Sequence, residues 1–145
     1  MKKWLWDSMN TMTKLYESHL LPVCEKYDLT KAELDILLFF ANNPQYDRAV
    51  DVIEVRKVAK SHVSVSVKSL LEKGYLKGIY EEDNARDVHL KVMKKADGIL
   101  KDGRAAQEHF QKTLFHGLSK EQIEVMKQNI DQMMTNAKEY YEGNR

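Results

Sequence analysis

The strongest constraint on the fold is the spacing of two short helical patterns in the middle of the chain. Residues 49–56 form the first pattern. In the second, Val63, Val67 and Leu70 recur at steps of four and three, so that one face of a helix is apolar. Gly74 then supplies a residue suited to the left-handed conformation that ends many helices. Two short helices separated by a few residues predict a helix-turn-helix.

A hairpin pattern follows directly. Residues 75–80 indicate one strand and residues 88–92, in which polar and apolar side chains alternate, indicate a second, with the polar segment 81–87 between them. A hairpin after a helix-turn-helix is a wing. We therefore expect a winged helix-turn-helix region over residues 30–93, in a fold that is mainly α with a small β-hairpin.

Helix signals precede this region. Apolar residues at steps of three and four predict a helix over residues 2–26, with a frayed end marked by Pro22 and the Tyr27-Asp28 pair. Thr30 and Glu33 are spaced as a capping box, in which the hydroxyl accepts a backbone N–H three residues on and the carboxylate reaches back. The next helix is expected to begin there.

Two further helices are predicted after the hairpin, one from Lys94 to Phe115 and one that opens with a second capping box at Ser119 and Gln122. Residues 30–93 are large enough to fold alone, so the apolar stripes of the outer helices are surplus surface in a monomer. We expect one domain over residues 1–145 in which residues 2–26 and 94–141 form dimerisation helices. The open alternative is that these stripes cover a monomer core.

Charge is balanced overall and uneven locally. The 145 residues include 23 Lys and Arg against 22 Asp and Glu, a net charge of +1, which excludes a histone-like polycation. Residues 56–78 hold six basic side chains and a single acidic one, Glu72. A basic block on an element that fits the major groove is suited to neutralising phosphates, although such a block can also be a plain solvated face.

The helix that contains Val63 should present a small polar face on its outer side. Serine and histidine hydrogen-bond to base edges, lysine binds guanine or phosphate, and an exposed valine packs on a thymine methyl group. His62 on the flank could instead be an ordinary surface histidine. The residues expected to contact DNA here are Lys57, Lys60, Ser61, His62, Ser64, Val65, Lys68 and Ser69.

Other function classes find little support in the sequence. The five histidines lack metal-binding spacing and there is no glycine-rich phosphate loop, so we expect no catalytic site, metal or cofactor. The single cysteine, Cys24, cannot form an internal disulfide. Packing is its simpler role, although a neighbouring lysine could activate the thiol. Neither a signal peptide nor a membrane span is recognisable, which predicts a cytoplasmic protein.

Four stretches taken together resemble the MarR family of bacterial winged helix-turn-helix transcription regulators, over about Leu15 to Tyr140. They are Leu29–Leu34, Lys60–Ser64, Leu71–Leu76 and Asp83–Arg86. The resemblance implies a homodimer held by the first and last helices, with a recognition helix in each major groove. It also implies a wing arginine in the flanking minor groove, and Arg86 occupies that position.

The chain departs from the family pattern at three places. Asn84 stands where the family usually has an aspartate that positions the wing, and Asp83 or Asp87 could take that role. Ala59 stands where a capping serine usually precedes the recognition helix. Cys24 lies near the end of the first helix, whereas peroxide-sensing members have a reactive cysteine early in it, so thiol sensing is not implied.

The expected function is that of a sequence-specific DNA-binding transcriptional regulator, a ligand-responsive repressor that binds a pseudo-palindromic operator as a homodimer. Many members of the family respond to phenolic or carboxylic compounds, which implies a small aromatic or apolar effector. Met12, Tyr16 and His19 are candidate pocket residues for it, and they could equally be core. The alternative function is a winged-helix module for protein–protein interaction, without DNA specificity.

Overall fold

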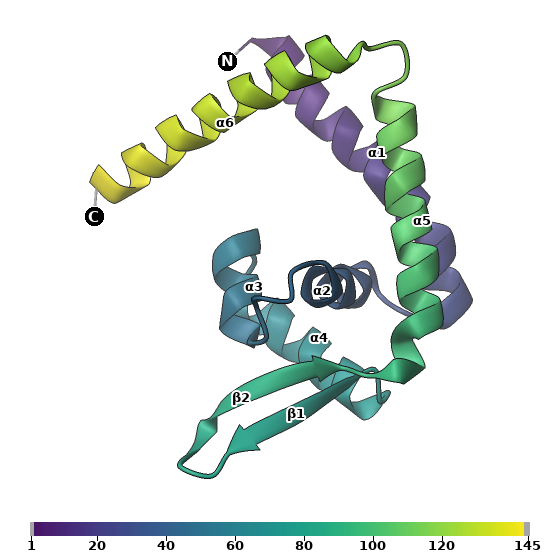
Figure 1. Cartoon of the computed structure of the whole chain (residues 1–145), viewed down its shortest axis with the longest axis vertical. Coiled ribbons are helices and arrows are strands. Elements are labelled where there is room, and N and C mark those ends of the chain that lie inside the picture. The colour runs from purple at the N-terminus through teal and green to yellow at the C-terminus, as the bar shows by residue number, and fades with distance from the viewer. Residues whose placement is uncertain (1, 144–145) are drawn as a thin grey trace. The chain divides into compact units, whose positions relative to one another are not determined.

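The computed structural model describes residues 2–143, apart from the side chains of Asn84 and Ala85. The chain forms two compact units that divide between Phe110 and Gln111, and each is described by itself. The elements in chain order (Figure 1) are α1 (Lys3–Tyr27), α2 (Lys31–Asn42), α3 (Ala49–Arg56), α4 (Lys60–Glu72), β1 (Leu76–Glu81), β2 (Asn84–Val92), a 3₁₀ turn (Lys94–Ala96), α5 (Asp97–Leu114) and α6 (Lys120–Gly143). The expected class, mainly α with one hairpin, is confirmed.

The sequence predicted that the first helix frays at Pro22, but the structure shows no fraying there. It continues through this proline to Tyr27, and Asp28 then ends it in the left-handed conformation with φ 52°. Proline removes one backbone donor, but Leu20 and Val23 on either side of it are buried, so packing holds the helix together. At its end, the Tyr27 hydroxyl donates to Asp102 on α5 over 2.8 Å.

The second helix is the centre of the core of the first unit. Thr30 and Glu33 form the predicted capping box, with both reciprocal hydrogen bonds at 3.1 Å. Beyond it the helix is buried on nearly every side, with Leu34, Leu37 and Phe39 at 1% exposure or less. A helix that is apolar all round needs covering on several faces. Both α1 and α4 pack against it.

The wing is a longer hairpin than the sequence predicted. Strand β2 begins at Asn84, although the segment up to Asp87 was expected to be a loop. The register changes between Tyr80, which pairs with Val88, and Glu81, which pairs with Asn84. The irregularity lets the strand contain polar residues that break the alternation, because a bulge re-aims side chains at the point where it occurs.

The second unit consists of residues from Gln111 onward and is dominated by α6. Its predicted capping box is confirmed. The backbone N–H of Gln122 donates to Ser119 Oγ over 3.1 Å, and the backbone N–H of Ser119 donates to Gln122 Oε1 over 2.8 Å. No described residue of α6 is buried. This helix is therefore an amphipathic helix whose apolar side chains are open to solvent in the single chain.

Candidate nucleic-acid interface

Helix α4 has the two faces that its sequence predicted. Val63, Val67 and Leu70 are buried against the core, with exposures of 2%, 8% and 0%. The opposite face carries Ser61, Ser64, Val65 and Lys68, all exposed, with Val65 at 69%. An exposed valine among small polar residues makes no favourable contact with water, but it is suited to pack against the methyl group of a thymine at a base edge.

Ser69 does not belong to that outer face, and this part of the prediction is wrong. Its hydroxyl donates to Glu33 Oε2 of α2 over 2.9 Å. Lys73, one turn later, donates to the same oxygen over 3.0 Å and to the backbone carbonyl of Asp28 over 2.9 Å. Both polar side chains therefore fasten α4 to α2. Lys73, one lysine of the basic block, is therefore bound to groups of its own chain.

The Glu33 carboxylate is buried, and two opposing effects act on it. Burial alone would raise its pKa, but hydrogen bonds from the Thr30 backbone, Lys73 and Ser69 outweigh burial, so the pKa lies below its ordinary value. The carboxylate is consequently charged at neutral pH. It joins a capping box at the start of α2 to the far end of α4.

The base of the wing is tied to the loop that precedes α3. Asp87 on β2 forms an ion pair with Arg48 over 3.2 Å, and the Leu90 amide donates to the Asp47 carbonyl over 2.6 Å. Asp87 was one of the two aspartates expected to position the wing, and it does contact a neighbouring segment. The side chain of Asn84 lies outside the described residues.

A groove of about 400 Å³ runs between α4 and the wing. Three predicted residues line it, namely Ser64 and Lys68 from α4 and Arg86 from β2. Arg48 and Tyr80 also line it and were missed. Alternation in β1 could have indicated Tyr80, an aromatic side chain that is 62% exposed. The groove brings cations and hydrogen-bond donors from two elements to one surface.

The start of α4 matches the expected departure from the family pattern. Ala59 is its N-cap and provides no side-chain hydrogen bond, so the first amides of the helix lack a side-chain acceptor. Lys60 is the first residue of α4, and Lys57 caps the end of α3 in the left-handed conformation with φ 55°. Free amides at a helix N-terminus beside lysines form a site where a phosphate can bind.

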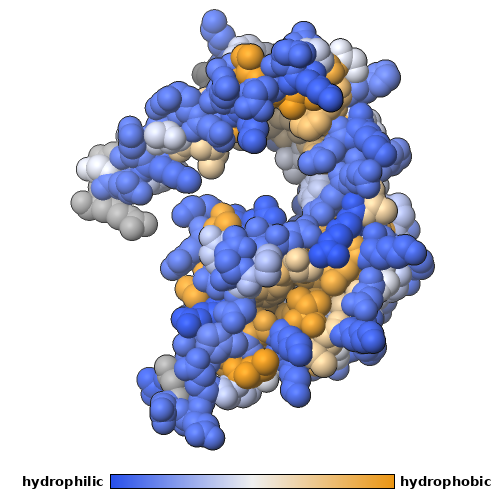
Figure 2. All heavy atoms as spheres, in the orientation of Figure 1, coloured by the Kyte–Doolittle hydropathy of each residue, from blue (hydrophilic) through white to orange (hydrophobic). Residues whose placement is uncertain are grey.

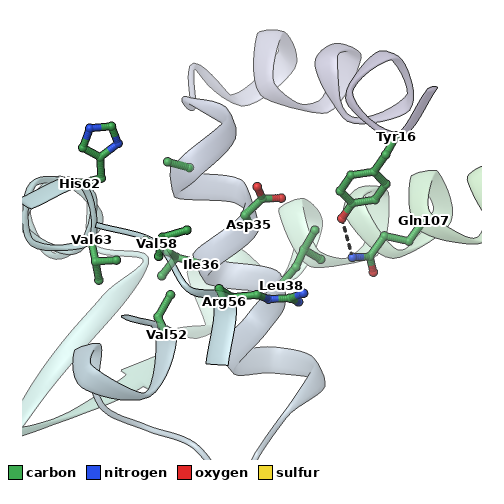
Figure 3. Close-up of a pocket in the computed structure, with 11 residues that line it drawn as sticks. Tyr16, Asp35, Ile36, Leu38, Val52, Arg56, Val58, His62, Val63 and Gln107 are labelled. Carbon is green, nitrogen blue, oxygen red and sulfur yellow. Dashed lines mark hydrogen bonds between the residues drawn. The ribbon is translucent and has the colours of Figure 1, made fainter. Parts of the chain in front are cut away.

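A separate cavity of about 390 Å³ lies on the other flank of α4, within the first unit (Figure 3). His62 and Val63 of α4 line it together with Tyr16 of α1, Asp35 of α2 and Gln107 of α5. Figure 2 shows apolar residues that reach the surface where α2, α4 and the wing meet. His62 thus belongs to the wall of a cavity as well as to the exposed surface of the helix.

Only one of the three predicted pocket residues lines that cavity, and this is Tyr16. Met12 is 42% exposed, and His19 packs edge-on against His109 with ring centroids 4.8 Å apart. Met12 and His19 therefore do not line this cavity. They lie on the same face of α1 as Tyr16. Along that face, however, the residues are exposed to solvent in the first turns and contact α5 a few turns later.

Several other features of the described residues bear on function. Burial is the main cause that raises the pKa of the Cys24 thiol, which favours a packing role over a thiolate. Within residues 2–143, no helix is long and apolar enough to cross a membrane. The same part of the chain holds no cluster of three or more side chains able to ligate a metal ion.

Comparison with known proteins agrees with this geometry. Residues 27–87, from the end of α1 to the wing, match the sequence model of the MarR family. No curated protein matches the chain in sequence. The predicted resemblance to the MarR family is nevertheless confirmed by the family model and by similar solved structures.

Three of those structures illustrate the similarity. A MarR family transcriptional regulator from Listeria monocytogenes, solved with 26mer DNA, has a TM-score of 0.82 and 16% identity over 94% of this chain and 89% of its own. A MarR protein from Peptoclostridium difficile has a TM-score of 0.84 and 15% identity over 100% and 94%. The S. aureus MepR–DNA complex has a TM-score of 0.72 and 17% identity over 94% and 98%. At these identities the likeness shows a shared winged-helix fold.

Proposed function

From a winged helix-turn-helix region that matches the sequence model of the MarR family, we propose that this chain binds double-stranded DNA and regulates transcription. The observation that carries the proposal is the exposed face of α4. Ser61, Val65 and Lys68 lie on it, and among the described residues none of their side chains has a hydrogen-bond or ion-pair partner. These side chains fit base edges in a major groove. Two of the similar structures are DNA complexes, one of a MarR family transcriptional regulator and one of MepR.

The contacts divide into two kinds. Ser61, His62, Val65 and Lys68 read bases, while Lys57, Lys60 and Ser64 hold the phosphate backbone on either side of the base-reading face. Arg86, exposed on β2, enters the minor groove beside the site. Tyr80 and Arg48, which line the groove with Arg86, add phosphate contacts. Ser69 is not in this set, because Glu33 binds it.

The regulator acts as a homodimer. The first turns of α1 expose Trp4, Trp6, Met9 and Met12 at 42–65%, and α6 exposes Ile130 and Met133 at 48% and 55%. Clusters of this kind mark interfaces. We assign residues 2–26 and 94–141 to dimerisation and residues 30–93 to DNA binding. Two recognition helices then face half-sites of a pseudo-palindrome about one helical turn, or ~10 base pairs, apart.

The protein is a cytoplasmic repressor that responds to a small molecule. The cavity beside α4 is the effector site, because His62 and Val63, in the first turn of the recognition helix, form part of its wall together with Val58, which precedes the helix. A ligand there contacts the helix that reads DNA. It changes operator affinity only if it prefers one position of that helix over another.

The test begins with selection of bound duplexes from a random pool, followed by binding of the selected site at several salt concentrations. Counterion release predicts a linear fall of log affinity with log salt. Lys60→Met should weaken all sequences alike and make the slope shallower by about 1, whereas Arg86→Ala should weaken only the selected site, by roughly 1–3 kcal/mol. No selected sequence and a flat salt response would instead indicate a protein–protein module.

A further inference from the structure

The cavity beside α4 combines apolar walls with few polar groups. Ile36, Leu38 and Val52 line it with Val58 and Val63, and its volume of about 390 Å³ suits a small organic molecule. The polar groups in its wall are Tyr16, Asp35, Arg56, His62 and Gln107. The charge of a ligand is decided by which of these groups still lacks a partner.

Two of the polar groups satisfy each other. Gln107 Nε2 donates to the Tyr16 hydroxyl over 3.0 Å, and Gln107 Oε1 accepts a hydrogen bond from Asn42 Nδ2 over 3.2 Å. The amide is thereby fixed by groups on α1 and α2. The pair forms one side of the cavity (Figure 3), and its hydrogen-bonding capacity is largely used inside the protein.

Asp35 differs from them. Its side chain is half-buried, and Figure 3 shows its carboxylate directed toward the space between His62 and Tyr16. Within residues 2–143 no donor is hydrogen-bonded to the Asp35 carboxylate and no cation lies within ion-pair distance of it. Burying a carboxylate without such a partner costs free energy. Burial is the main cause that raises the pKa of Asp35, and the nearby charges of Lys31 and Arg56 only partly offset it.

Arg56 is the cation that could favour the opposite kind of ligand. It is exposed to water, and its guanidinium lies over the Phe39 ring, 5.4 Å from the centroid. A solvated charge that already has a partner gains less from a bound anion than a half-buried carboxylate without a partner gains from a bound cation. Of the two charges, Asp35 should therefore decide which ligand binds.

We propose that this cavity binds an apolar or aromatic molecule that carries a protonated amine, with the ammonium group donating hydrogen bonds to Asp35. The aromatic body packs on Ile36, Val52 and Val63, where it displaces water from apolar walls. The identity of the cavity as the effector site rests on the proposed function above. The choice of a cation over an acid rests on Asp35 alone, and it differs from the phenolic and carboxylic effectors that the family resemblance implies.

The test uses three molecules of one shape, 2-naphthylmethylamine, 2-naphthalenemethanol and 2-naphthoic acid, titrated calorimetrically into the full-length protein. The parent should bind the amine at least about tenfold more tightly than the alcohol, since a charge-assisted hydrogen bond to a half-buried carboxylate is strong. Asp35→Asn should abolish that preference while the alcohol still binds. Binding of the alcohol shows that the variant still has the cavity.

Arg56→Gln is the matched control, because it removes the other charge of the cavity wall. It should preserve or strengthen the preference for the amine, as a repelling cation is lost. Preference for the acid in the parent, an amine preference that survives Asp35→Asn, or no binding by any of the three molecules would overturn the proposal. If the amine binds through Asp35 but leaves operator affinity unchanged, the proposed effector role fails and the ligand assignment stands.

Discussion

His89 Nδ1 lies 2.8 Å from Asp47 Oδ2, so a side chain of strand β2 is bound to the loop that precedes α3. The other ring nitrogen, Nε2, lies 3.1 Å from Glu81 and 4.0 Å from Asp87. Hydrogen bonding to Asp47 is the main cause that raises the pKa of His89, with burial and Arg48 opposing it. Three carboxylates around one imidazole favour the doubly protonated ring, although within the described residues Nε2, unlike Nδ1, makes no hydrogen bond.

The first prediction is that the wing is held more firmly at acid pH. A histidine whose pKa is raised on folding adds stability that is fully present below its ordinary pKa, near 6.5, and that is lost as pH rises through the raised value. The unfolding free energy of the parent should therefore exceed that of His89→Gln most at low pH, with the difference shrinking toward high pH. Urea titrations from about pH 5 to about pH 9 measure it.

Asp47→Asn provides the control for this pH dependence, because it keeps the size of the side chain and removes its charge. The variant should lose most of the pH dependence that His89→Gln loses. A difference between parent and His89→Gln that grows as pH rises would contradict the assignment.

The second prediction concerns the buried carboxylate between α2 and α4. Glu33→Gln removes the charge that holds Ser69 and Lys73, and we expect a loss of about 1–3 kcal/mol in the free energy of unfolding. Because the pKa of Glu33 is lowered on folding, its contribution is present above the ordinary value near 4.5 and is lost as pH falls through the lowered value.

A matched control for Glu33 is Glu17→Gln. Glu17 also pairs with a lysine, Lys31, over 2.6 Å, but both side chains are 46% exposed. Exposed pairs contribute less than about 1 kcal/mol. Equal losses for the two variants would show that burial of Glu33 has no energetic consequence.

Local signals in the sequence predicted the starts of α2 and α6 correctly, because a capping box needs only residues three apart. Thr30 with Glu33 and Ser119 with Gln122 form as expected. The inward face of α4 was equally predictable from its period. What failed depends on segments far away in the chain. The partner of Ser69 is 36 residues earlier, and no periodicity within α4 reports it.

The residues that line the cavity beside α4 were hard to predict for a related reason. A stripe on α1 specifies which side chains share a face but not which element covers each turn. Tyr16 meets Gln107 and the cavity, whereas His19, one turn later, meets His109. Asp35 was missed because a carboxylate in a helix usually faces water, and its half-buried position follows from packing around α2.

The third prediction separates DNA contact from stability on one helix. Ser61→Ala should weaken binding to the selected operator by about 1–3 kcal/mol and relax sequence preference, with little effect on unfolding. Ser69→Ala should do the reverse, because its hydroxyl is bound to Glu33. Electrophoretic or fluorescence binding assays and urea unfolding, run on both variants, provide the comparison. If Ser69→Ala reduces operator affinity as much as Ser61→Ala while leaving stability intact, the division of the helix faces is wrong.

The fourth prediction is that the protein sediments as a dimer with twice the chain mass of 16.9 kDa and that Ile130→Asp disrupts it. Ile130 is 48% exposed in the single chain, on a helix with no buried residue among those described. An aspartate placed in an apolar seam loses its hydration without gaining a partner, which costs several kcal/mol. Gln128→Asp adds the same charge two residues away, on the opposite side of α6, and should leave the dimer intact. A parent that sediments as a monomer at micromolar concentration would refute the dimer, and equal dissociation by both variants would show that the apolar face of α6 is not the seam.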